Sequence, residues 1–463
     1  MRGGGRHAVF QPTTALPGVR NIHRQQMRDR PMQAYRAALL HCLADPREVG
    51  IERSYQYFED GLLLVENGRI VRIGAAAELL PGLPAGVGVA EYRDALIVPG
   101  FVDTHIHYPQ LDVIASYGSQ LLEWLETYTF PAEARFADPA HARAQARLFL
   151  AELLRNGTTT ALVFATVHPQ SVDAFFEEAS RLDLRMIAGK VLMDRNAPDG
   201  LRDSAASGYA ESRALIERWH GKGRLHYAVT PRFAPTSTPG QLDLAGRLLR
   251  EYPGLYLHTH LSENRAEIDW VKELFPERRH YLDVYDHHRL LGERSVFAHG
   301  VHLCDDECRR LGESGSAVAF CPTSNLFLGS GLFDLARLEG HGVRVGLGTD
   351  VGGGTSFSQL QSLNEAYKVL QLQGQKLDPF KALYLATLGG ARALYLDERI
   401  GNLQPGKDAD FVVLDCKATP LLARRLEQAR SLAERLFALM ILGDDRAVRE
   451  TFAAGRSVHR RDV

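Results

Sequence analysis

Short apolar segments alternate with amphipathic segments along most of this chain, from about residue 95 to residue 350. The apolar segments have the length and residue types of buried strands, whereas the segments between them, such as 141–157 and 264–275, have helical periodicity. This alternation is typical of parallel strand–helix units. The eight predicted strands are 95–107, 158–167, 184–194, 224–233, 254–263, 294–303, 317–325 and 343–350.

Such units build either a closed barrel or an open doubly wound sheet, and the polar residues favour the barrel. In a barrel the carboxyl ends of the strands converge on one face, whereas an open sheet would spread them along an edge. We therefore predict an α/β fold of the (β/α)8 TIM-barrel type. The polar residues at strand ends are His105 and His107 in the first strand, Arg232 in the fourth, His260 in the fifth, His299 in the sixth and Asp350 in the eighth.

Both flanks of the predicted barrel are rich in turns and short strands. Residues 55–98 contain two apolar runs joined by Asn67-Gly68, which is a hairpin signal. We predict that the termini form one small β-domain from residues 32–98 and 399–463, next to a catalytic barrel of residues 99–398. Residues 1–31 are rich in arginine and are predicted to be a disordered N-terminal extension.

Composition argues against proteins that bind nucleic acid, span a membrane or depend on disulfides. The chain has 463 residues and a formal net charge of −2, which provides no field for steering it onto nucleic acid or an anionic membrane. Its five cysteines are scattered and odd in number, so free thiols in a reducing compartment are expected. No apolar run reaches the ~18 residues of a membrane span. We predict a cytoplasmic protein that acts on a small molecule.

Two pairs of histidines carry the first candidate chemistry. His105 and His107 are two residues apart in a strand, so their side chains face the same side, and neutral imidazoles are natural zinc ligands. His258 and His260 repeat this spacing, and His260 lies nearer the open face, which makes it the better ligand and His258 a supporting residue. Asp350 adds a carboxylate. Structural histidines are the alternative at each position alone, but four groups at matching strand ends predict a metal site.

Two further groups complete a hydrolytic site. A bound ion lowers the pKa of its water towards ~7, and Glu263, three residues after His260, is placed to carry that proton to a leaving amine. A solvated or helix-capping acid is the alternative for Glu263. His299 would hydrogen-bond the water or bind the ion, with a buried structural histidine as its alternative. Asp103 is expected to support the site, and the glycines after Asp350 to form a tight turn.

Several motifs resemble those of the metal-dependent amidohydrolase superfamily. They are PGFVDTHIHYPQ (99–110), THLSEN (259–264), FAHG (297–300) and GLGTD (346–350). Four other stretches resemble the guanine deaminase family within it, and the likeness extends from about residue 50 to the end. These stretches are LLEWLETYTFPAE (121–133), TPRFAPT (230–236), CPTSNLFLGSG (321–331) and GTDVGGGTSF (348–357).

The resemblance implies a zinc-dependent hydrolysis of guanine to xanthine and ammonia, in purine catabolism, by a homodimer. It implies one zinc ion per subunit, held by His105, His107, His260 and Asp350. Glu263 would be the proton shuttle, and His299 and Asp350 the other catalytic groups. The purine-binding residues that it implies are Gln110, Arg232, Phe233, His260, Glu263 and Asp350. Because a guanidinium only donates hydrogen bonds, Arg232 should favour a 6-oxo over a 6-amino group.

Three alternatives stay open beside this interpretation. The same barrel would serve a deaminase of another heterocycle, such as an oxidised guanine or a pterin. A non-catalytic scaffold would be favoured if a ligand histidine were missing, but all are present. Binding to nucleic acid would rest only on the N-terminal arginines.

The resemblance also bears on the number of metal ions. Binuclear relatives use a carboxylated lysine of the fourth strand. Here Lys190 lies on the third strand, which favours a single ion.

Overall fold

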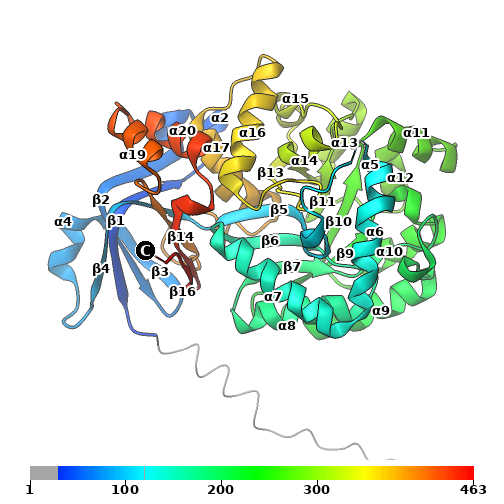
Figure 1. Cartoon of the computed structure of the whole chain (residues 1–463), viewed down its shortest axis with the longest axis horizontal. Coiled ribbons are helices and arrows are strands. Elements are labelled where there is room, and N and C mark those ends of the chain that lie inside the picture. The colour runs from blue at the N-terminus through cyan, green and yellow to red at the C-terminus, as the bar shows by residue number, and fades with distance from the viewer. Residues whose placement is uncertain (1–29, 119, 463) are drawn as a thin grey trace, which may run out of the picture.

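Eight parallel strands form a nearly closed barrel, seen on the right of Figure 1. The computed structural model describes residues 30–118 and 120–462, so the predicted extension lies almost wholly outside the described residues. Neighbouring strands follow the order β13-β12-β11-β10-β9-β7-β6-β5, and the short β8 pairs with β9. This arrangement confirms the predicted barrel. The eight barrel strands are β5 (Phe101–His107), β6 (Thr158–Phe164), β7 (Arg185–Gly189), β9 (His226–Pro231), β10 (Tyr256–Leu261), β11 (Ser295–His299), β12 (Ala317–Phe320) and β13 (Arg344–Leu347), and the additional β8 is Val191–Leu192.

The first and last strands of the barrel are joined through the segment that follows β13. The backbone N–H of Asp350 donates to the carbonyl of His105 at 2.9 Å. Deeper in the barrel, the carboxylate of Asp103 accepts from the backbone N–H of Thr349 at 3.1 Å and from its hydroxyl at 2.5 Å. These bonds attach the segment that carries Asp350 directly to β5. Two parts of the chain that are distant in sequence therefore meet at the carboxyl end of the barrel.

The predicted strand 95–107 is in fact two strands in two different sheets. Its first part belongs to β4 (Val89–Pro99) of the small sheet, and its second part is β5 of the barrel. The chain passes between the sheets at Gly100, whose N–H donates to the carbonyl of Asp410. A Cβ at Gly100 would lie 2.1 Å from Oγ1 of Thr159, so only glycine fits this junction. The predicted run of apolar residues was correct, but the sequence did not indicate the change of sheet.

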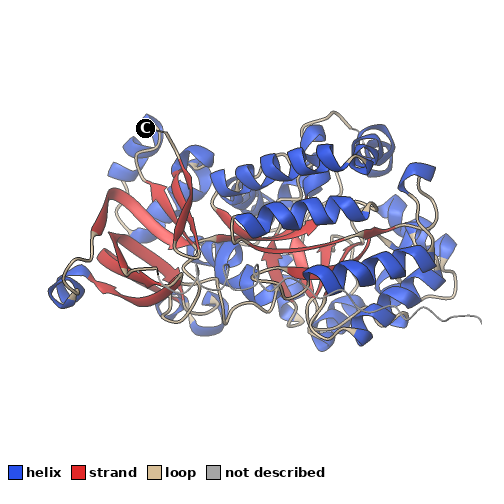
Figure 2. Cartoon of the chain, turned by 90° about the horizontal axis from the view of Figure 1, so that it is seen from below, coloured by secondary structure: helices blue, strands red, loops and turns tan. Residues whose placement is uncertain are grey.

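Helices cover the outside of the barrel (Figure 2). The predicted helix 141–157 is α7 (Pro139–Arg155), which begins at the N-cap Asp138 and is followed by Gly157 at φ 79°. This agrees with the usual preference for Asp at the N-cap and glycine after the last turn. The other long helices are α8 (Pro169–Arg181), α9 (Ala205–Trp219), α10 (Pro239–Glu251), α11 (Arg265–Leu274), α13 (Asp305–Ser314) and α16 (Gln359–Leu372). Shorter ones are α12 (Tyr281–His287), α14 (Pro322–Phe327), α15 (Leu335–Gly340), α17 (Pro379–Tyr384) and α18 (Gly390–Ala393).

The two ends of the described chain assemble into a separate sheet, as predicted. Its order is β16-β15-β14-β4-β1-β2-β3, so the three strands from the C-terminal end join the four from the N-terminal end through the antiparallel pair of β14 and β4. The hairpin between β2 and β3 turns at Asn67 and Gly68, which both have positive φ. The strands are β1 (Gln33–Cys42), β2 (Tyr55–Glu66), β3 (Arg69–Ala75), β4, β14 (Phe411–Asp415), β15 (Val448–Ala453) and β16 (Arg456–Arg460). Between β14 and β15 lie two helices that the β-type prediction missed, α19 (Pro420–Glu427) and α20 (Leu432–Leu442).

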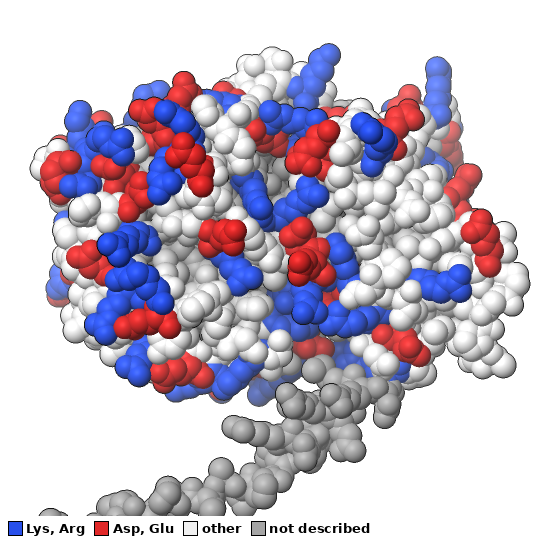
Figure 3. Space-filling model, turned by 180° about the vertical axis from the view of Figure 1, so that it is seen from behind, with Lys and Arg blue, Asp and Glu red and all other residues white. Residues whose placement is uncertain are grey.

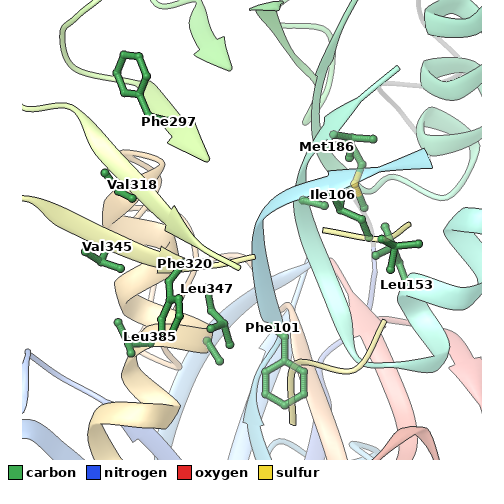
Figure 4. Close-up of a cluster of buried hydrophobic side chains, with 14 of the residues drawn as sticks. Phe101, Ile106, Leu153, Met186, Phe297, Val318, Phe320, Val345, Leu347 and Leu385 are labelled. Atoms are coloured by element: carbon green, nitrogen blue, oxygen red, sulfur yellow. The ribbon is translucent and has the colours of Figure 1, made fainter. Parts of the chain in front are cut away.

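Both faces of the barrel strands are buried, which explains their continuous apolar character. On β11, for example, Val296 belongs to the cluster inside the barrel, whereas the next residue, Phe297, packs in the layer between strands and helices. Figure 4 shows this outer layer, in which Ile106, Met186 and Val318 lie with residues of the surrounding helices such as Leu153. The strands are thus held rigidly from both sides, which fixes the positions of the side chains at their ends.

The described surface matches the near-neutral charge of the sequence. On the face shown in Figure 3, basic and acidic side chains are interspersed. All five cysteines are free thiols, in agreement with the expectation from their number. Among the described residues, no helix is both long and apolar enough to cross a membrane.

The close approach of β7 and β9 leads to a stability prediction. A Cβ at Gly189, the last residue of β7, would lie 1.7 Å from the carbonyl oxygen of Ala228. Gly189→Ala should therefore force the strands apart and lower the free energy of unfolding by about 1–3 kcal/mol, visible as a lower melting temperature. Gly200→Ala is the control, because nothing lies within 4 Å of its added Cβ. Equal melting temperatures for the two variants would contradict this packing.

Candidate active site

Five of the residues singled out in the sequence meet at the carboxyl end of the barrel. His105 and His107 lie on β5, His260 on β10, His299 at the end of β11, and Asp350 follows β13. All are buried except His260, which is partly exposed. Strands from opposite sides of the barrel, and the segment that closes it, therefore direct polar side chains to one point. This is the face on which barrel enzymes carry their sites.

Four of these groups have the mutual spacing of ligands that share one ion. Nε2 of His107 lies 3.2 Å from Nε2 of His105 and 3.2 Å from Nε2 of His260. Oδ1 of Asp350 lies 3.1 Å from Nε2 of His105 and 3.3 Å from Nε2 of His107. Tetrahedral ligands about 2.0–2.1 Å from zinc are roughly 3.3 Å apart. These four distances between neighbouring ligand atoms fit residues that hold a single ion.

Burial keeps these groups in the protonation states that bind metals. Desolvation lowers the pKa of His107 to about 3 and lowers that of His260 well below its usual value, so both imidazoles are neutral. Burial by itself would raise the pKa of Asp350, but the neighbouring His105, by charge and by hydrogen bonding, holds it well below its usual range. Neutral imidazoles and an ionised carboxylate are the forms in which these side chains act as ligands.

Hydrogen bonds at the far side of the rings direct Nε2 into the cluster. Nδ1 of His105 lies 2.7 Å from Nε2 of His258, and Nδ1 of His260 lies 2.7 Å from the carbonyl oxygen of Arg232. Because a carbonyl only accepts, Nδ1 of His260 carries the proton and its Nε2 presents a lone pair. His258 lies behind His105, so the structure places it outside the group of four.

Two other groups of possible metal ligands share residues with this group of four. One nitrogen each of His105, His260 and His299 lie within 4.8 Å of one another, as do ligand atoms of His105, Cys321 and Asp350. The Cys321 thiol is a poor ligand candidate, because desolvation raises its pKa well above the usual value and the thiolate is the form that binds metals. Nε2 of His299 faces carboxylates on two sides, 3.3 Å from Glu263 and 3.7 Å from Asp350. Its position is therefore between the cluster and Glu263.

Glu263 is a buried acid with a raised pKa, and neither of its alternative roles fits. Burial, with a contribution from Asp350, raises the pKa of Glu263 to about 8. Its Oε1 accepts a hydrogen bond from the hydroxyl of Ser330 at 3.0 Å. The N-cap of α11 is Asn264, paired with Glu267 in a capping box, so Glu263 does not cap the helix. A buried carboxyl next to a metal-type cluster is a suitable group to hold and release a proton near neutral pH.

Left-handed backbone at two strand ends helps to aim these side chains. His299 has φ 72° and Asp350 has φ 51°, a region that non-glycine residues rarely adopt and that recurs at functional sites. The glycines after Asp350 form the tight turn expected from the sequence. A Cβ at Gly352 would lie 2.7 Å from the carbonyl oxygen of Gln110, and one at Gly354 would lie 1.8 Å from that of Thr349.

A pocket opens directly above the cluster. Its polar wall contains Gln110 and Arg232, and Phe233 lines it beside them. Arg232 had been predicted as a polar residue at a strand end, whereas Gln110 and Phe233 had been predicted only from the resemblance. The remaining lining residues outside the cluster are Leu121, Trp124, Leu125, Glu263, Glu267, His299, Leu328 and Gly353. A slot lined by both apolar side chains and hydrogen-bonding groups suits a flat, mostly neutral ring.

Sequence reasoning missed several residues that organise this site. Glu133 is fully buried and accepts hydrogen bonds from Arg232. Asn325 lies 2.9 Å from Nδ1 of His299 through its Oδ1, and Ser330 donates to Glu263. Glu133, Asn325 and Ser330 all fall within stretches that resemble guanine deaminases. That resemblance was the available signal, because hydrophobic periodicity does not distinguish a buried polar residue in a loop from a solvated one.

Comparison with known proteins agrees with this site. A sequence profile of the Amidohydrolase family matches residues 96–458. The guanine deaminase of Escherichia coli (strain K12) is 56% identical over 418 residues, which cover 90% of this chain and 95% of that protein. A solved structure of E. coli guanine deaminase superposes with a TM-score of 0.91 at 54% identity, covering 93% of this chain and 100% of the other.

Two more distant structures carry bound groups. A guanine deaminase from C. acetobutylicum with guanine in its active site is 27% identical, with a TM-score of 0.84, and covers 93% of this chain and 100% of its own. A Xanthomonas campestris adenosine deaminase with bound zinc shares the fold at 24% identity and a TM-score of 0.78, covering 92% of each chain. The chain belongs to the Amidohydrolase family of metal-dependent hydrolases and, within it, to the guanine deaminases.

Proposed function

We propose that this protein hydrolyses guanine to xanthine and ammonia in purine catabolism. The observation that carries the proposal is a cluster of three imidazoles and one carboxylate, in which four neighbouring pairs of ligand atoms lie 3.1–3.3 Å apart. The cluster lies on the floor of a pocket that contains Arg232. The membership of the chain in the guanine deaminases supports the choice of substrate. In the reaction a water oxygen forms a bond to C2, the bond from C2 to the exocyclic nitrogen breaks, and that nitrogen leaves as ammonia.

We propose that His105, His107, His260 and Asp350 hold one zinc ion per subunit. When bound, zinc lowers the pKa of a water molecule and makes it a nucleophile at neutral pH. The residues contribute by geometry: neutral imidazoles and an ionised carboxylate are fixed with their lone pairs directed at one point. His258, behind His105, acts as a support that orients the ligand ring.

Glu263 is the proposed proton shuttle. Its carboxyl is buried, hydrogen-bonded to Ser330 through Oε1, and has Oε2 directed towards His299. It takes a proton from the attacking water and delivers it to the departing amino group, which must leave as neutral ammonia. His299 and Asp350 orient the attacking oxygen, since Nε2 of His299 lies within 3.7 Å of both carboxylates.

The purine lies, in this proposal, between Phe233 and the polar wall formed by Gln110 and Arg232. A guanidinium has donors only, so it satisfies the 6-oxo group of guanine and leaves a 6-amino group unmatched. An unmatched buried pair costs about 1–3 kcal/mol, which is enough to choose between two bases. His260, Glu263 and Asp350 complete the contacts on the side of the ring where the reaction takes place.

Three further proposals concern the whole molecule. The catalytic barrel is residues 99–398, and residues 32–98 with 399–463 form the small β-domain, as the two separate sheets support. The enzyme acts as a homodimer, which light scattering of the purified 51.4 kDa chain would test. It works in the cytoplasm, without nucleic acid or membrane as partner, an assignment supported by its free thiols and balanced surface charge.

The metal assignment predicts different outcomes for two histidines. His107→Ala should reduce the zinc content of the purified protein far below one ion per subunit, whereas His299→Asn should keep the ion and lose turnover. Elemental analysis by mass spectrometry measures the zinc. His287→Ala, at an exposed position of α12, is the matched control. Loss of zinc from His299→Asn with retention in His107→Ala would favour the grouping of His105, His260 and His299 instead.

The shuttle assignment predicts that Glu263→Gln retains zinc but lowers kcat for guanine by about 100-fold or more, because a positioned acid–base group contributes about 10²–10⁴ in rate. Ultraviolet absorbance follows the formation of xanthine. Glu273→Gln, on the exposed side of α11, should behave like the unaltered enzyme. Near-normal turnover by Glu263→Gln would remove the shuttle role, and absence of xanthine formation by the unaltered zinc enzyme would overturn the proposed function.

A further inference from the structure

A buried acid stands behind the polar wall of the pocket. Glu133 lies on α6 (Phe130–Ala134), has no exposed surface, and does not line the pocket. Its two oxygens accept from Nη1 of Arg232 at 2.9 and 2.8 Å, and Oε1 also accepts from Nε2 of Gln110 at 3.1 Å. One carboxylate thus contacts both polar residues that face the proposed purine site.

We propose that Glu133 is a specificity-determining positioning residue, which fixes Arg232 and Gln110 so that the polar wall presents hydrogen-bond donors and selects ligands with an acceptor, such as an oxo group. The inference rests on the proposed function, because it explains how that site recognises its purine. Glu133 itself does not reach the ligand; it acts through the two side chains in front of it.

The contacts of Arg232 explain its fixed orientation. Its guanidinium carbon lies 5.4 Å from the centre of the Phe130 ring, and Nη1 is committed to Glu133. Its carbonyl oxygen accepts from Nδ1 of His260, so the backbone cannot shift without moving that ring. The remaining N–H groups of the guanidinium are the ones left to face the pocket.

The contacts of Gln110 explain why the wall offers donors. Since the carboxylate of Glu133 only accepts, it requires the NH2 end of the Gln110 amide and directs the amide oxygen the other way. That oxygen accepts from the backbone N–H of Gly352 at 3.3 Å. The second hydrogen of Nε2 is then the group available to a ligand. Without Glu133, only the 3.3 Å bond from Gly352 would hold the amide. The amide could then turn over more readily and present its oxygen, which would suit an amino group.

The charge of the pair also defines the ligand class. An unpaired guanidinium in a buried wall would favour an anion, such as a carboxylate or phosphate, and its burial would be costly. Glu133 neutralises Arg232 without occupying all of its donors. The wall is therefore rich in donors but has no net charge. This combination fits a neutral heterocycle with an acceptor atom better than it fits an anionic metabolite.

The test compares two ligands that are not deaminated. Hypoxanthine and unsubstituted purine differ by the 6-oxo group and its accompanying ring proton, and neither has a 2-amino group. Binding to the full-length zinc enzyme is measured by calorimetry or by competitive inhibition. The unaltered protein should bind hypoxanthine at least about tenfold more tightly than purine, the range of one buried hydrogen bond to a charged donor. Equal affinities would overturn the donor-wall account without any variant.

Variants then assign that preference to Glu133. In Glu133→Gln the preference should fall about tenfold, because the charge-assisted bonds that fix both side chains are lost. Glu133→Asp keeps the charge and should keep the preference within about threefold. Asp112→Asn removes an exposed carboxylate paired with Arg135 and should change nothing. Zinc content and melting temperature are measured for each protein.

The outcomes separate this inference from the proposed function. If Glu133→Gln weakens both ligands equally, or leaves their ratio unchanged, the residue is merely structural and the inference is wrong. The same holds if Glu133→Asp loses the preference while remaining folded. Failure of the unaltered enzyme to form xanthine from guanine would overturn the proposed function instead. The ratio of the affinities for hypoxanthine and purine would still test whether the polar wall selects an acceptor.

Discussion

The rest of the structure depends on one constraint: neutral imidazoles and an ionised carboxylate must be held next to one another in a buried site. Such an arrangement is costly to bury unless each group has a partner. The rings of His105 and His260 meet that requirement with hydrogen bonds at Nδ1, and Asp350 lies against two imidazoles. The barrel supplies the rigidity, since its strands are packed on both faces up to the ends that carry these residues.

Arg232 connects the two halves of the site. Its backbone carbonyl orients the ring of His260, and its side chain forms part of the polar wall of the pocket. Arg232 would therefore serve both in the recognition of the purine ring and in the placement of His260 as a metal ligand. Glu133 extends this connection to α6, in the long segment after β5 that also supplies Trp124 and Leu125 to the pocket. The site is built as one unit from segments far apart in the sequence.

The features that follow from periodicity could be predicted from the sequence. The spacing of His105 and His107, and the recurrence of polar residues at strand ends, led to the barrel and to the group of four. The change of sheet at Gly100 could not be predicted, because it depends on contact with Thr159 and Asp410 from elsewhere in the chain. Likewise, nothing local marks Glu133 as buried, since its burial depends on the partners that Arg232 and Gln110 provide.

The central claim is that these four side chains share one ion, and X-ray absorption at the zinc edge of the purified full-length protein tests it most directly. We expect scattering from nitrogen and oxygen neighbours at about 2.0–2.2 Å, with an imidazole pattern. A sulfur neighbour at about 2.3 Å, as ligation by Cys321 would give, would contradict it. So would a second metal at about 3.5–4 Å, because His105, His107, His260 and Asp350 provide ligands for one ion.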